Sequence, residues 1–357
     1  MRYRRPDRPS DREGAAVGRR RAFIGSFTAA GGPGVLVAAV DDDTGALTVL
    51  GAADDVPDPS YLALAADGNT LYAVSETAQG AVAAYRVSGD KPELAGPPVP
   101  VGGSGPTHLG LFAGHVLTAN YGSGSVTAVP VRADGTLAGS ASDVLQHTGS
   151  GPHPARQRGP HAHQVQPDPS GRWVVGVDLG TDSVHVCALR DGGLVPHRET
   201  ALRPGSGPRH LAFHPDGSYA YVLNELAPTV TVCRWDAAEG LLTPLRETPV
   251  LRGAPDGDAY PSGIVASPDG RFVWTATRGQ DAVSVLAVDD AGAALRLVDT
   301  VPCGGHWPRA LAASDGFLYT ANERSGDVTW FALDPDTGIP RRTGSIEVPA
   351  VSCVILG

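Results

Sequence analysis

The chain has 357 residues, of which 41% are hydrophobic, and it carries a formal net charge of −10 with its histidines neutral. This acidic balance excludes a general attraction to nucleic acid or to anionic lipid, so any specificity for an anion must be local. Glycine (46) and proline (31) are abundant but alternate with valine-rich runs, which indicates many short strands and turns.

Residues 1–19 are rich in Arg, Asp and Pro, and we expect them to form a disordered basic tail. The arginines at 19–21 and the apolar stretch up to Val40 imitate a twin-arginine export signal. Glycines and a proline at 31–34 interrupt this stretch, and residues 24–28 match residues 73–77 of a later repeat. We therefore interpret the stretch as strands of the fold and predict a cytoplasmic protein. No other span is apolar for long enough to cross a membrane.

A unit that begins at a proline recurs along most of the chain. By subtraction, its copies are separated by 47, 54, 48, 53 and 47 residues, and they start at Pro59, Pro106, Pro160, Pro208, Pro261 and Pro308. About ten residues after most of these prolines, an Asp-Gly or Ser-Gly pair marks a tight hairpin, in which glycine supplies a positive φ. Each unit then holds strand-like runs that bring it to four strands in about 50 residues, which is the size of a propeller blade.

Six complete units run from Pro59 to about Val348, and the two ends of the chain supply a seventh. Residues 21–53 provide three strands, and residues 349–356 provide the missing innermost strand. The sequence therefore predicts an all-β fold, a seven-bladed β-propeller with four antiparallel strands per blade, over a single domain at 20–357. Pairing of the C-terminal strand with the N-terminal blade would close the ring and remove exposed sheet edges.

The register of the repeat selects candidate functional residues. In an up-and-down blade, the start of the innermost strand and the loop after the second strand lie on the same face, so side chains there converge on one channel mouth. Ionisable and polar residues at these positions include His108, His161, His163, Arg209, His210, Arg309, Glu76, Asn120, Asp178, Asn224, Glu225, Arg278, Asn322, Glu323 and Arg324. Such a collection is typical of a binding site, although an Asn after a strand often only closes a turn.

Two groups among these candidates have particular chemistry. Strand alternation places His161 and His163 on one side, but no third ligand is marked beside them, so we predict no metal there. Arg209 and Arg278 would carry uncompensated charge in a channel unless they meet Glu225 or an anionic ligand.

Residues outside this set are interpreted as structural. His185 lies in a predicted strand and His147 lies in a loop or turn. The four cysteines are far apart in apolar runs, and we expect buried free thiols.

With these motifs assembled, the sequence resembles the propeller lactonase family that includes bacterial 6-phosphogluconolactonases and fungal carboxy-muconate lactonising enzymes. The resemblance covers nearly the whole chain after the tail and rests on residues 23–28, 159–164, 207–217, 221–226, 277–279 and 348–354. It implies catalytic roles for a histidine, two arginines and a glutamate, which fall on His161 or His163, Arg209, Glu225 and Arg278. Of the two histidines, His163 is the preferred match.

The resemblance implies hydrolysis of a sugar-acid lactone, specifically 6-phosphogluconolactone, without metal or cofactor. His163 or Glu225 would activate water, His161 would protonate the leaving oxygen, and the two arginines would stabilise the oxyanion or bind a phosphate. Substrate contacts are expected from Asn120, Asp178, Asn224, Arg309 and Asn322. The expected partner is a small anionic lactone, with neither nucleic acid nor membrane. Two alternatives stay open, namely a muconate-type lactonising isomerase and a non-catalytic propeller that binds protein partners on its rim.

Overall fold

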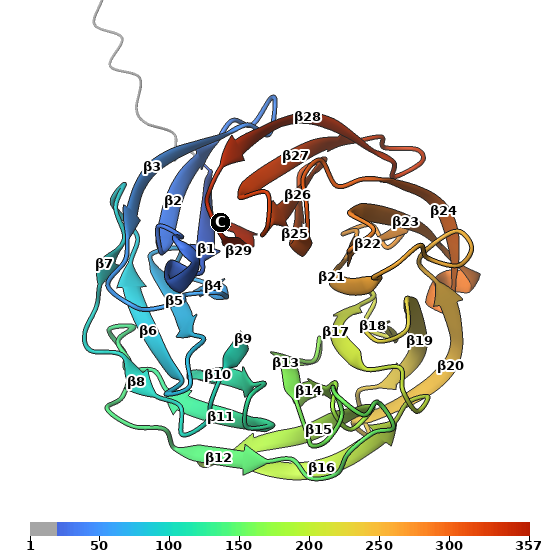
Figure 1. Cartoon of the computed structure of the whole chain (residues 1–357). Helices are drawn as coiled ribbons and strands as arrows, with labels where there is room; N and C mark the ends of the chain where they lie inside the picture. Colours follow the sequence, from blue (N-terminus) through green and yellow to red (C-terminus); the bar gives the residue numbers. More distant parts are fainter. Residues whose placement is uncertain (1–19) are drawn as a thin grey trace, which may run out of the picture.

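The innermost strands begin at, or within three residues of, the prolines that lead the repeat. The computed structural model describes residues 20–357, which form six four-stranded sheets and one five-stranded sheet arranged in a ring (Figure 1). The predicted all-β, seven-bladed β-propeller is confirmed, whereas the expectation for residues 1–19 lies outside the described part of the chain. Within residues 20–357, no helix has the length and apolar character needed to span a membrane.

The N-terminal blades show how sequence and ring order correspond. Blade 1 consists of β29 (Val351–Leu356), β1 (Arg21–Ser26), β2 (Val35–Val40) and β3 (Leu47–Ala53), with a 3-10 turn, η1 (Thr28–Ala30). Blade 2 consists of β4 (Leu62–Leu64), β5 (Thr70–Ser75), β6 (Ala81–Arg86), β7 (Glu93–Leu94) and β8 (Val99–Pro100). Its fourth strand is split into β7 and β8, which both pair with β6, because Pro97 and Pro98 between them have no N–H to donate.

The remaining blades follow in chain order from the innermost to the outermost strand. Blade 3 is β9 (Pro106–Phe112), β10 (His115–Asn120), β11 (Ser125–Pro130) and β12 (Asp143–Gln146). Blade 4 is β13 (Ala162–Pro167), β14 (Val174–Asp178), β15 (Ser183–Arg190) and β16 (Gly193–Ala201). Blade 5 is β17 (Pro208–Phe213), β18 (Tyr219–Asn224), β19 (Thr229–Asp236) and β20 (Leu241–Pro249).

Blades 6 and 7 complete the ring. Blade 6 is β21 (Tyr260–Ala266), β22 (Phe272–Arg278), β23 (Ala282–Asp289) and β24 (Ala294–Pro302), with a 3-10 turn, η2 (Asp290–Gly292). Blade 7 is β25 (Pro308–Ser314), β26 (Phe317–Asn322), β27 (Asp327–Leu333) and β28 (Pro340–Glu347).

The two ends of the described chain close the ring, as predicted. Strand β29 pairs antiparallel with β1, with Ile24 opposite Val354. Both strands then pack against blade 7 through a buried cluster that includes Tyr319 and Trp330. The last strand is therefore held by sheet hydrogen bonds on one side and by apolar burial on the other.

Aromatic side chains also join several blades to the blade that follows. Tyr72, Tyr221 and Tyr319, all on second strands, donate hydrogen bonds of 2.8, 3.1 and 2.9 Å to carbonyl oxygens in the outer hairpin of the following blade. Trp274 makes the same contact in blade 6. These hydrogen bonds link neighbouring blades to one another. All four cysteines are buried free thiols, as expected.

Candidate active site

Three arginines converge on one glutamate at the channel mouth. Glu225 directly follows β18, Arg209 lies near the start of β17, and Arg278 ends β22. Glu225 Oε2 lies 3.0 Å from Arg209 Nε and 2.8 Å from Arg278 Nη2. Its other oxygen, Oε1, accepts a hydrogen bond of 2.5 Å from Arg156, which lies on the loop between β12 and β13. We call these four residues the Glu225 cluster.

The charges in the Glu225 cluster do not cancel. The side chains of Glu225, Arg209 and Arg278 are only 3%, 4% and 9% exposed. Burial would raise the pKa of Glu225, but Arg278 and Arg209 outweigh it and hold this pKa well below its usual range. Three guanidinium groups against one carboxylate leave a formal charge of 3 − 1 = +2. An excess of buried positive charge favours an anionic ligand.

Tyr121 connects this cluster to the two candidate histidines. Its hydroxyl accepts a hydrogen bond of 3.2 Å from Arg156. Its ring stacks on His161 with 4.4 Å between ring centroids, and it meets His163 edge-on at 5.4 Å. The structure thus brings together all five predicted catalytic residues, His161, His163, Arg209, Glu225 and Arg278.

The surroundings of the two histidines differ. His161 Nδ1 lies 2.8 Å from the carbonyl oxygen of Tyr121. Because a carbonyl can only accept, Nδ1 donates the hydrogen bond, and in the neutral form of the ring the lone pair lies on Nε2. His163 is only 6% exposed, and its Nδ1 has no hydrogen-bond partner. Burial and the charge of Arg209 lower the pKa of His163 well below its ordinary value, so this ring is neutral and weakly basic at neutral pH.

Arg309 lies in a second group of charges with the opposite balance. Its guanidinium pairs with Glu323 at 3.0 Å and with Glu76 at 3.6 Å, and it covers the Phe27 ring at 4.9 Å. Burial raises the pKa of Glu76, although Arg309 and a hydrogen bond from Ser60 act against this rise. We call Arg309, Glu76 and Glu323 the Arg309 cluster. Its single arginine already has two carboxylate partners.

The other four residues predicted to contact substrate point into the protein. Asn120, Asp178, Asn224 and Asn322 lie at the ends of second strands, as expected, but all four are fully buried. Each asparagine amide donates to side chains five and seven residues later, as Asn120 does to Ser125 and Thr127. These asparagines close the turns of their own blades, so the substrate-binding role expected for them is not retained. Asp178 likewise accepts hydrogen bonds from neighbouring backbone.

Three residues near the mouth are not among those that the sequence predicts. Arg156 lies on a long irregular loop that has no place in the repeat, whereas Tyr121 directly follows Asn120 and could have been found from the strand register. Trp307 adopts a φ of +66°, which is strained for a bulky side chain. The guanidinium of Arg324 lies 3.3 Å from the centroid of its ring, and that of Arg278 lies 5.7 Å away. The Trp307 ring therefore lies next to the Glu225 cluster, beside the guanidinium group of Arg278.

Comparison with known proteins identifies the family of the chain. A family described as "Lactonase, 7-bladed beta-propeller" matches residues 21–356. The 6-phosphogluconolactonase of Bacillus subtilis is 35% identical over 342 residues, which cover 93% of this chain and 97% of the relative. The crystal structure of the periplasmic gluconolactonase of Pseudomonas aeruginosa superposes with a TM-score of 0.88 at 31% identity, covering 94% of this chain and 98% of the other. A Lactobacillus plantarum protein has a TM-score of 0.89 at 28% identity, with 95% and 99% covered. The chain belongs to the seven-bladed β-propeller lactonases.

Proposed function

We propose that this chain hydrolyses the lactone of an anionic sugar acid, specifically 6-phosphogluconolactone to 6-phosphogluconate, as in the pentose phosphate pathway. One observation carries the proposal: the Glu225 cluster has two positive charges in excess and lies beside two imidazoles. The name of the Bacillus subtilis relative supports the choice of substrate.

The first chemical step requires a base that can take a proton from water. His161 Nε2 has the free lone pair for this task, since the Tyr121 carbonyl holds the proton on Nδ1. The water oxygen attacks the carbonyl carbon of the lactone, and the carbonyl π electrons move onto its oxygen. We assign general-base catalysis to His161, which contributes about 10²–10⁴ in rate.

The second step opens the ring. Arg209 and Arg278 stabilise the negative charge on the oxyanion, because both are nearly buried and fixed by Glu225. When the tetrahedral intermediate collapses, the bond between the carbonyl carbon and the ring oxygen breaks. The proton held by His161 then passes to the ring oxygen and yields a hydroxyl group and a carboxylic acid, which releases its remaining proton to solvent and becomes the carboxylate. The mechanism uses no metal and no cofactor.

Glu225 and His163 take different roles from those considered on sequence grounds. A carboxylate with a lowered pKa and three arginine partners is a weak base. Glu225 therefore acts as a positioning residue that aims the guanidinium groups. His163 is neutral and close to Arg209, so we assign it a hydrogen bond to the substrate.

Arg156 is the arginine best placed for the charged end of a substrate. Its side chain is 34% exposed, far more than those of Arg209 and Arg278, so its free N–H groups can reach a phosphate without displacing the ion pair. This division leaves the two buried arginines for the reacting carbonyl.

A substrate assay with purified protein tests the proposal. We expect 6-phosphogluconolactone to be hydrolysed well above its spontaneous rate, with a higher kcat/KM than unphosphorylated gluconolactone. The variant His161→Gln serves as the control and should lose about 10²–10⁴ in kcat. Hydrolysis of neither lactone, or activity only on a muconolactone, would refute the proposal and favour the isomerase.

We also propose a cytoplasmic location. Strands β1 and β2 lie within residues 21–40, and β1 pairs with the closing strand β29, so cleavage after an export signal at this position would remove half of blade 1. Fractionation of the native host tests this point: recovery in the periplasmic fraction of a chain that lacks residues 21–40 would contradict it.

A further inference from the structure

Between blades 3 and 4 lies a cluster of potential metal ligands that the proposed mechanism does not use. His147, Asp178 and His185 each offer one nitrogen or oxygen atom, and these atoms lie within 4.8 Å of one another. His147 Nδ1 is 2.8 Å from Asp178 Oδ2, and the two imidazole rings stack with 3.8 Å between centroids. The cluster contains two imidazoles and a carboxylate, a ligand set that suits zinc and similar ions.

All three residues depart from the repeat of the propeller. The position of His185 is held by Thr127, Thr231, Ser284 and Thr329 in blades 3, 5, 6 and 7. The position of Asp178 is held by an asparagine in blades 3, 5 and 7. One residue directly follows the fourth strand and donates its backbone N–H to the turn before the third strand. In blade 3 this residue is His147. Elsewhere it is the buried apolar Val101, Leu202, Val250, Cys303 or Val348.

The three departures have the same chemical consequence. The hydrogen bond from an asparagine to a threonine suffices to close the turn in the other blades, as Asn224 and Thr231 show. Blade 4 replaces each member of this arrangement by a residue that can bind a metal ion, and the adjoining blade 3 replaces its apolar residue by a third one. Three such replacements at adjoining positions are more than the turn requires.

The carboxylate of Asp178 is held in place for a ligand. Its Oδ1 accepts backbone hydrogen bonds from His161, Gly180 and Thr181, at 2.8, 2.9 and 3.2 Å. The other oxygen, Oδ2, faces His147. The backbone thus fixes the direction of the carboxylate, as the supporting contacts of metal ligands commonly do.

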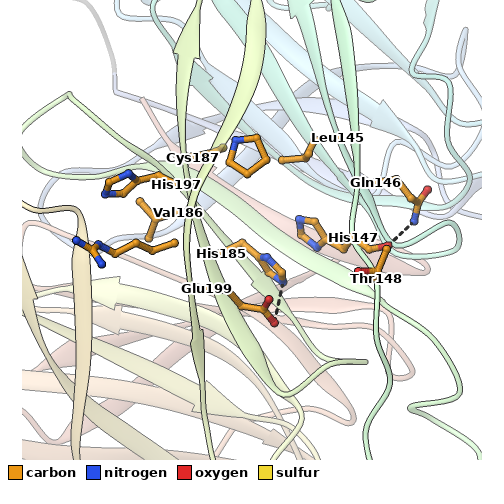
Figure 2. A pocket seen from close by; sticks show the side chains of 11 residues that line it. Leu145, Gln146, His147, Thr148, His185, Val186, Cys187, His197 and Glu199 are labelled. Carbon is orange, nitrogen blue, oxygen red and sulfur yellow. Dashed lines mark hydrogen bonds and ion pairs between the residues drawn. The ribbon is translucent and has the colours of Figure 1, made fainter.

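A cavity gives an ion access to the cluster. It has a volume of about 280 Å³ and is lined by His147, Thr148, His185 and Glu199, among others. Figure 2 shows His147 and His185 close together, with Glu199 directed at His185. Glu199 Oε1 lies 4.0 Å from His185 Nε2 and could serve as a fourth ligand. The side chain of His185 is 17% exposed, so the cluster is reached from this side.

We propose that His147, Asp178 and His185 form a binding site for a divalent transition-metal ion of the zinc type, between blades 3 and 4 and separate from the Glu225 cluster. The two rings are stacked, so their nitrogen lone pairs lie in nearly parallel planes. The rings must tilt for these lone pairs to converge on one ion, and the cavity leaves space for this movement.

Metal titration of the full chain tests the site. After treatment with a chelator, the protein is titrated with Co²⁺, followed by visible absorption, and with Zn²⁺, followed by calorimetry. We expect one ion per chain. The variants His185→Thr and His147→Val restore residues found in other blades, so they should fold, and each should weaken binding at least about tenfold. The matched control is His306→Gln, which removes another histidine paired with an aspartate, Asp281, and should bind as the wild type does.

The outcomes are distinct. Stoichiometric binding that is lost in His185→Thr and kept in His306→Gln supports the site. Absence of stoichiometric binding by the wild type, or equal binding by His185→Thr, would overturn it and leave the cluster as a buried hydrogen-bond network. Binding is measured without substrate, so neither outcome depends on the lactonase proposal.

Discussion

The Glu225 cluster and the Arg309 cluster contain the same types of residue with opposite balance. In the first, one carboxylate meets three guanidinium groups, whereas in the second one guanidinium group meets two carboxylates. Apart from Arg156, which lies on a loop, the residues of both clusters come from the same repeat positions, the start of an innermost strand and the end of a second strand. Only the first has positive charge left for a ligand. The difference indicates that the ratio of charges, and not the presence of arginine at the mouth, distinguishes the proposed active site.

The largest expected difference between the two clusters is in how much each one contributes to the free energy of unfolding. Glu225→Gln leaves three arginines without their carboxylate, and breaking a buried ion pair costs about 3–5 kcal/mol. Glu323 is 25% exposed, and Glu323→Gln should cost about 1 kcal/mol or less. Urea unfolding of the two variants gives both free energies. Equal losses would mean that the two clusters do not differ as described.

Catalysis should respond to the same comparison. Arg209→Gln removes a donor to the oxyanion and should lower kcat/KM by about 10²–10³. Arg309→Gln, the matched variant in the other cluster, should lower it less than about tenfold, since Arg309 is already paired with Glu76 and Glu323. Steady-state kinetics on 6-phosphogluconolactone measures both effects. An equally severe loss in Arg309→Gln would place the reacting carbonyl nearer the Arg309 cluster.

A smaller kinetic effect should distinguish Arg156 from the other arginines of the Glu225 cluster. Arg156→Gln removes a partly exposed guanidinium and should raise KM for the phosphorylated lactone about tenfold, the value of one charge-assisted hydrogen bond. The same change should leave kcat for unphosphorylated gluconolactone nearly unaltered. If both substrates lose kcat alike, Arg156 acts on the reaction itself and not on the phosphate.

The smallest effect concerns pH. Burial raises the pKa of Glu76, so the folded state binds the carboxyl proton more tightly than the unfolded state does. The free energy of unfolding therefore falls as the pH rises above the unfolded pKa of about 4.3. For Glu225 the sign is reversed, because its pKa is lowered: its contribution is present above the unfolded pKa and is lost as pH falls toward the folded pKa.

The variant Glu76→Gln removes only the first of these contributions. Relative to the wild type, it should become more stable as the pH is raised from about 4 to 7. Urea unfolding at several pH values measures this difference. A difference that stays constant or falls with pH would show that Glu76 has no raised pKa.

Much of the fold could be predicted from the sequence because the repeat has a physical marker at each boundary. Glycines in the Asp-Gly turns have the positive φ that the hairpins require, as Gly217 and Gly270 do with φ of +75° and +73°. The closing strand could be predicted because residues 349–356 match the one strand that blade 1 lacks. The split of β7 from β8 depends on two prolines within an otherwise regular position.

The site was predictable only in part. Register shows which residues lie at the mouth, and this was enough for Arg209, Glu225 and Arg278. It does not show which way a short polar side chain turns, so the sequence predicts Asn120 and Asn224 as substrate contacts at the channel mouth, although they close turns within their blades. Arg156 could not be predicted, because it lies on an irregular loop whose path depends on tertiary contacts such as those of Gln157 with Leu179 and Asp182.

A crystal structure with the reaction product 6-phosphogluconate bound would test the central claim most directly. The account predicts that the carboxylate of the product lies within hydrogen-bonding distance of Arg209 and Arg278, beside His161, with its phosphate at Arg156. Product bound at the Arg309 cluster, or in the cavity between blades 3 and 4, would contradict it.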